Sequence, residues 1–141
     1  MIAVDHVGVP NTRLIVENPT FAQRYGNRSV AEQNSLALSW DLLMNDPVGR
    51  YKNLRSLLFT TQVELQRFRE LLVNAVMATD ICDKDLKQLR NARWDKAFAE
   101  NSKVSTSAAR DSPRDQVNRK ATIVIEHLIQ ASDVSHTMQH W

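Results

Sequence analysis

Apolar residues recur at helical spacing along most of the chain, and few helix-breaking residues interrupt them. The clearest stripe follows Thr61 and Glu64, which stand at the spacing of a capping box, where the hydroxyl and the carboxylate each accept from a backbone N–H near the other residue. Because the stripe lies on one face of a helix, we predict an amphipathic helix that begins there. The inward positions of this helix are Leu65, Phe68, Leu72, Ala75, Val76 and Thr79.

Two short helices are predicted near the start of the chain. Asn11 has the side chain of a helix cap, and Pro19 is expected to end the helix that follows it. Thr20 is expected to cap a second helix over residues 21–25. Gly26 is expected to end that helix, because glycine adopts positive φ without a steric cost.

A third helix is predicted to start at a second capping-box spacing, formed by Ser29 and Glu32. The run Asn45, Asp46 and Pro47 is expected to stop it. Its apolar face is predicted to carry Leu36, Trp40, Leu43 and Met44.

The second half of the chain predicts two more helices, separated by a polar loop over residues 100–113. Residues 83–98 favour a helix with Leu86 and Leu89 facing inward and Arg90 facing solvent. The last helix is apolar on several sides, which predicts deep burial, and its marker positions are Val117, Ala121, Val124, Ile125, Leu128 and Ser132. The pattern as a whole predicts an all-α, multi-helix bundle in one domain over residues 1–141.

Composition and charge exclude several classes of protein. The 18 Lys and Arg residues nearly balance 16 Asp and Glu, so no basic stripe for nucleic acid is indicated. No apolar run approaches the length of a membrane span, and no glycine-rich phosphate loop is present. The single Cys82 cannot form an internal disulfide, which favours a reducing compartment and predicts the cytoplasm.

A few polar residues are candidates for chemistry. Asp133 follows an apolar helical run, and a buried carboxylate there would need a cation or several donors. A helix-terminal cap explains Asp133 equally well. His127 is expected to be a hydrogen-bonded core histidine rather than a ligand, and Asp5 and His6 on their own suggest an ordinary turn.

Four segments, in this order along the chain, carry a family resemblance. They are VDHVGVPN at residues 4–11, SVAEQNS at 29–35, MATD at 77–80 and IQASDVSH at 129–136. Together they resemble the catalytic domain of the class I cyclic-nucleotide phosphodiesterases, over essentially the whole chain. The resemblance implies an all-helical HD-type domain that hydrolyses cAMP or cGMP to the 5′-monophosphate in signal transduction.

The resemblance also implies two divalent metals, described as zinc with magnesium or manganese, held between His and Asp side chains. Asp133 matches the late aspartate ligand of the family. Asp5 and His6 match the second Asp and His of an HDxDHPG motif, which support the metal site. Glu32 matches a glutamate that orients the acid histidine. Thr79 and Asp80 match a pair near the pocket.

The departures from the family pattern limit what this chain is expected to do. Ile2 and Ala3 stand where the family has a metal-binding His and Asp. The HNxxHA element with the acid histidine would lie before Met1, and the base-reading helices would lie after Trp141. We therefore expect a fragment or degenerate copy that does not hold both metals and is inactive by itself.

One alternative from another class of protein is a non-catalytic helical interaction module. Its apolar stripes would then serve packing or homo-oligomerisation. For the phosphodiesterase interpretation, we expect regulatory or cyclase domains as partners in a longer chain.

Overall fold

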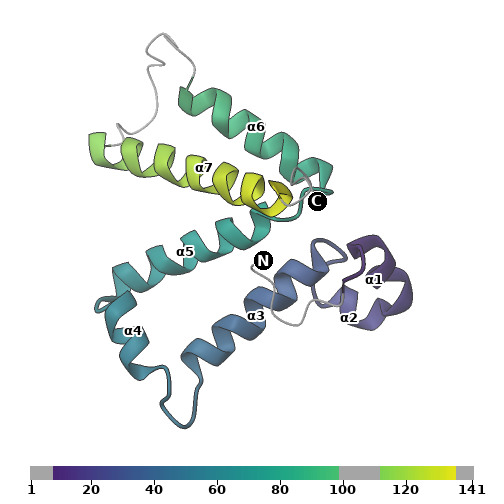
Figure 1. Ribbon diagram of the computed structural model, residues 1–141, viewed down its shortest axis with the longest axis horizontal. Coiled ribbons are helices and arrows are strands. Elements are labelled where there is room, and N and C mark those ends of the chain that lie inside the picture. Colours follow the sequence, from purple (N-terminus) through teal and green to yellow (C-terminus); the bar gives the residue numbers. More distant parts are fainter. Residues whose placement is uncertain (1–7, 99–111, 136–141) are drawn as a thin grey trace. The chain divides into compact units, whose positions relative to one another are not determined.

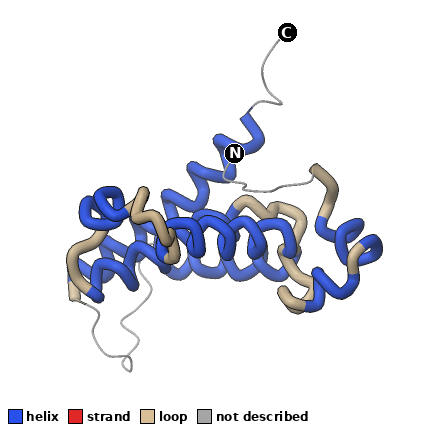
Figure 2. The backbone as a smooth tube through the Cα atoms, turned by 90° about the horizontal axis from the view of Figure 1, so that it is seen from below, coloured by secondary structure: helices blue, strands red, loops and turns tan. Residues whose placement is uncertain are grey.

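The prediction of an all-α fold is confirmed by the computed structural model, which describes residues 8–98 and 112–135. Every regular element within these residues is a helix (Figures 1 and 2). The helices are α1 (Asn11–Glu17), α2 (Pro19–Gln23), α3 (Val30–Met44), α4 (Lys52–Leu58), α5 (Gln62–Ala78), α6 (Lys84–Phe98) and α7 (Pro113–Val134). None of these helices combines the length and the apolarity that crossing a membrane requires.

The chain divides into two compact units, Met1–Asp80 and Ile81–Trp141. Unit 1 contains α1 to α5, and unit 2 contains α6 and α7.

The core of unit 1 lies where α1 and α2 meet the start of α3. Leu14, Ala22, Val30 and Ala31 are buried together there. The predicted caps of the two short helices are wrong. Pro10 precedes α1 without a side-chain cap, and α2 is capped by Asn18, whose Oδ1 accepts from the backbone N–H of Phe21 at 3.3 Å. Gly26 does adopt positive φ, at 62°, in the turn after α2.

Helix α3 begins where predicted, but not by the predicted capping box. Ser29 occupies the N-cap position with φ 40° and ψ 47°, in the left-handed region, and makes no side-chain cap bond. Its hydroxyl donates instead to Asp80, 51 residues further along the chain. A long-range contact has therefore replaced the local one that the Ser29 and Glu32 spacing suggested.

Helix α4 was not predicted, because its seven residues carry no repeated apolar stripe. It is joined to the end of α3 by Arg55, whose Nη1 donates to the carbonyl of Leu43 at 2.6 Å. A cation at this position compensates the free carbonyls at the end of a helix. Between α3 and α5, Trp40 stacks on Phe68 with ring centroids 6.5 Å apart.

The start of α5 agrees with its prediction. Thr61 and Glu64 form the full capping box, with each side chain accepting from the backbone of the other residue. Glu64 Oε2 also accepts from the Thr60 backbone N–H at 2.8 Å. These bonds, chiefly those from Thr60, lower the pKa of Glu64 from 4.5 to about 2.

The capping box is expected to make unit 1 less stable as the pH falls into the acid range. Because the pKa of Glu64 is lower in the folded chain than in the unfolded one, its contribution is complete above about pH 4.5 and is lost as the pH falls towards 2. Thermal melts of the wild type and of Glu64→Gln should therefore differ at neutral pH and converge in acid. Glu17→Gln serves as a control for an exposed carboxylate, and a difference that persists unchanged at pH 2 would contradict this assignment.

Unit 2 is a pair of helices lying side by side (Figure 1). Ser112 caps α7 by accepting from the backbone N–H of Asp115 at 3.2 Å. In the middle of the pair, the buried Glu126 faces Arg93, with Oε2 accepting from Nη1 at 3.2 Å and Oε1 lying 3.1 Å from Nη2. His127 is hydrogen-bonded as predicted, because its Nδ1 lies 2.8 Å from the carbonyl oxygen of Ile123.

Several predicted burials in unit 2 are wrong. Arg90 is only 8% exposed, whereas Leu89 is 60% exposed. On α7, Val117 and Leu128 are exposed, and the buried positions are Ile123 and Glu126. A helix paired with one neighbour covers one face only, so an apolar surface on several sides does not ensure burial.

Candidate functional site

The predicted site residues Glu32 and Asp80 are brought together by a third residue, Asn11. The Nδ2 of Asn11 donates to Glu32 Oε2 at 2.8 Å and to Asp80 Oδ2 at 3.3 Å. Its Oδ1 accepts from the backbone N–H of Ala31 at 2.9 Å. One amide therefore ties the start of α1 to the first turn of α3 and to the residues that follow α5.

Ser29 supplies a second donor to this cluster. Its Oγ donates to Asp80 Oδ2 at 2.7 Å, and both residues are buried. Glu32 lies in the first turn of α3, where the positive end of the helix dipole favours a carboxylate. We call these four residues, Asn11, Ser29, Glu32 and Asp80, the polar cluster. It fixes two carboxylates in place, and its only hydroxyl is already engaged.

The other predicted site residues lie outside the polar cluster or outside the described residues. Thr79 donates its hydroxyl to the carbonyl of Val76 at 2.7 Å, as part of the end of α5. Asp133 is half-buried on α7, one residue before that helix ends. Asp5 and His6 lie outside the described residues.

No set of metal ligands is assembled in residues 8–98 and 112–135. Within them, no three His, Cys, Asp or Glu side chains gather in a way that could hold a metal ion. Asp133 as a ligand, with Asp5 and His6 in support, stays a prediction.

Asn11 and Ser29 are members of the site that the sequence did not reveal. Both were expected to be local helix caps, a role for which Asn and Ser are common. Asn11 belongs to the segment at residues 4–11 and Ser29 to the segment at 29–35, both of which carry the resemblance. That membership was the one available indication of a role beyond capping.

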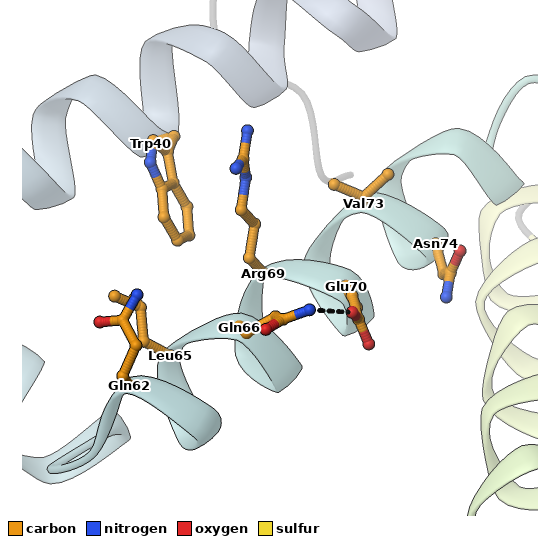
Figure 3. A pocket seen from close by; sticks show the side chains of 8 residues that line it. All are labelled: Trp40, Gln62, Leu65, Gln66, Arg69, Glu70, Val73 and Asn74. Atoms are coloured by element: carbon orange, nitrogen blue, oxygen red, sulfur yellow. Dashed lines mark hydrogen bonds between the residues drawn. The ribbon is translucent and has the colours of Figure 1, made fainter.

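An open groove in unit 1 follows α5 (Figure 3). It measures about 650 Å³, and its α5 residues recur every three or four positions, which places them on one helix face. Trp40 of α3 and Arg69 of α5 point towards one another across it, with the guanidinium 5.4 Å from the centre of the ring (Figure 3). The remaining lining residues are Gln62, Leu65, Gln66, Glu70, Val73 and Asn74. The groove is an open helix face and holds neither carboxylate of the polar cluster.

Comparison with known proteins gives two findings. A model of the 3'5'-cyclic nucleotide phosphodiesterase family matches residues 3–141. The human protein described as cGMP-inhibited 3',5'-cyclic phosphodiesterase 3A is 34% identical over 77 residues, which are 55% of this chain. The matched part is 6% of the length of that relative.

Proposed function

The chain belongs to the 3'5'-cyclic nucleotide phosphodiesterase family, and we propose that it forms part of the catalytic domain of an enzyme that hydrolyses a 3',5'-cyclic nucleotide. The family match over residues 3–141 carries this proposal. The substrate class, cAMP or cGMP, follows from the family. Hydrolysis would release the 5′-monophosphate and so end a cyclic-nucleotide signal.

The polar cluster supports a positioning role for Glu32 and Asp80 in that domain. Both carboxylates receive donors from Asn11, and Asp80 receives another from Ser29. Carboxylates held in this way keep their oxygens in fixed directions, which is what the orientation of a neighbouring imidazole requires. We propose that Glu32 orients the histidine that acts as the acid in the family reaction.

Within residues 8–98 and 112–135, no donor set fits a two-metal centre. Zinc, magnesium and manganese sites need several His, Asp or Glu ligands, but Ile2 and Ala3 supply none. Asp133 is the proposed ligand that remains, and one carboxylate cannot hold two cations against water. We therefore propose that the 141-residue chain does not hydrolyse cyclic nucleotides by itself.

Activity measurements on the purified chain test this proposal. With cAMP or cGMP and added Mn²⁺ or Zn²⁺, we expect no turnover above the no-protein control, and no difference between the wild type and Asp133→Ala. Turnover that needs the metal and disappears in Asp133→Ala would overturn the proposed inactivity.

A non-catalytic interaction module is a second candidate, favoured by the uncovered apolar side chains of unit 1. Leu57 is 84% exposed and Val63 is 78% exposed, near the corner between α4 and α5. Such uncovered apolar side chains would be available for contact with a partner or with a second copy of the chain. A stable dimer in light scattering, with no stabilisation by any divalent ion, would favour this function.

We propose the cytoplasm, because a single cysteine is typical of a reducing compartment. Regulatory or cyclase domains in a longer chain would be natural partners for a phosphodiesterase domain.

A further inference from the structure

The turn between α3 and α5 exposes a group of large apolar side chains. Helix α4 has no buried residue, and it carries three exposed leucines, Leu54, Leu57 and Leu58. The second and third of these stand three and four positions after the first, so all three share one helix face. Val48 is 76% exposed in the loop before α4, and Val63 is exposed in the first turn of α5. We call these five side chains the apolar corner.

The apolar corner lies at the end of unit 1 that is opposite to its buried core. That core is formed by α1, α2 and the start of α3, whereas α4 joins the far end of α3 to α5 (Figure 1). Arg55 fastens α4 to this end of α3 by donating to the carbonyls of Leu43 and Met44. None of the five apolar side chains lines the groove along α5. A protruding turn of this kind suits a flat surface better than a partner helix, which docks into a groove.

The charged side chains around the apolar corner are mainly basic. Residues 46–67 contain two acidic side chains and four basic ones, namely Asp46, Glu64, Arg50, Lys52, Arg55 and Arg67. Lys52 is exposed in the first turn of α4. Arg67 is exposed one turn after Val63, on the same face of α5. Among the described residues, no carboxylate pairs with Lys52 or Arg67, so both cations are available to a ligand.

The two acidic side chains do not cancel this positive charge. The side chain of Asp46 is fully covered, and its carboxylate accepts from the backbone N–H groups of Val48 and Tyr51. It also pairs with Arg50, so these two charges offset one another. Glu64 is held in the capping box of α5, where the positive end of the helix dipole offsets part of its charge. The net charge around the apolar corner is therefore positive.

We propose that the apolar corner docks on a membrane surface that contains anionic lipids. Leucine and valine side chains that protrude from a turn can enter the boundary between lipid head groups and acyl chains. Lys52 and Arg67 beside them can then contact anionic head groups, with their aliphatic stems along the apolar part. The positive charge favours this occupant over a second copy of the chain, because a second copy would bring the same cations to the contact. The docking needs neither a metal nor a cyclic nucleotide and goes beyond the proposed function.

Co-sedimentation with lipid vesicles tests the proposal on the 141-residue chain. One set of vesicles contains phosphatidylcholine alone, and the other contains phosphatidylcholine with phosphatidylserine. We expect binding to the vesicles with phosphatidylserine that weakens as sodium chloride is added, because salt screens the contact between the cations and the head groups. No binding, or equal binding to both sets of vesicles, would overturn the proposal.

Two pairs of variants locate the contact. Leu57→Gln should weaken binding to the anionic vesicles about tenfold, because it removes an inserted apolar side chain. Leu89→Gln makes the same change at an exposed leucine of α6 and should stay within twofold of the wild type. Lys52→Gln should weaken binding about fivefold, whereas Lys96→Gln, in the last turn of α6, should stay within twofold. Equal weakening within either pair would mean that the corner is not the contact.

Light scattering without lipid tests the competing occupant. We expect the wild type and Leu57→Gln to have the same molar mass at the concentrations used for sedimentation. A dimer of the wild type that Leu57→Gln dissociates would show that a second copy covers the apolar corner, and would overturn the proposal. The substituted positions are all exposed, so circular dichroism should show the same helix content for every variant. None of these measurements depends on cyclic-nucleotide hydrolysis.

Discussion

Replacing Asn11 by aspartate is expected to destabilise unit 1 by about 3 kcal/mol. The change removes the Nδ2 that donates to both Glu32 and Asp80, and it places a third carboxylate between them. Aspartate can still accept from the Ala31 N–H, so the loss comes from the two donated bonds and the new repulsion. Asn11 is only half-buried, which keeps the expected value below that of a fully buried charge cluster.

Urea denaturation followed by circular dichroism measures this effect. Asn11→Ala should fall between the wild type and Asn11→Asp, because it loses the donors without adding charge. Asn53→Asp makes the same chemical change at an exposed position in α4 and should stay within about 0.5 kcal/mol of the wild type. If Asn11→Asp matches Asn53→Asp, the polar cluster does not stabilise the unit.

Replacing Arg93 by methionine is expected to destabilise unit 2 by about 2 kcal/mol. The variant leaves the buried Glu126 carboxylate without its cation, and such a charge is costly in a helix interface. The side chain of Arg93 is itself 43% exposed, so water partly replaces it and lowers the expected loss.

The double variant Arg93→Met with Glu126→Leu gives the sharper test. Two apolar side chains need no charge partner, so the double variant should recover most of the stability that Arg93→Met loses. Lys96→Met on the same helix is the matched control and should have little effect. If the double variant is less stable than Arg93→Met, the unpaired carboxylate of Glu126 is not the reason why Arg93→Met loses stability.

The sequence predicted elements whose causes are local. The Thr61 and Glu64 box formed as expected, because all of its atoms lie within one turn of the chain. The same spacing at Ser29 and Glu32 failed, because Asp80 and Asn11 compete for these side chains from distant parts of the sequence. A local motif cannot indicate such competition.

Burial was harder to predict, because it depends on the neighbouring element. Arg90 stands among charged residues in the sequence and was assigned to solvent, yet the α6 face that carries it is covered. The prediction of the all-α class did not depend on which residues are buried, because it used only the helical periodicity.

The candidate site was predictable in part. The resemblance selected Glu32 and Asp80, and the structure joins both through Asn11. It could not identify Asn11 or Ser29 as partners, because which donor reaches a carboxylate is decided by the tertiary packing of α1, α3 and α5.

Because Ser29 has a left-handed backbone, the amino acid that suits position 29 best depends on the residue at position 80. Glycine would relieve about 1 kcal/mol of steric strain there. It would also forfeit a hydroxyl bond to a carboxylate, which contributes about 1.5 to 3 kcal/mol. Serine is therefore the better residue only while Asp80 is present, and the two sites form an epistatic pair.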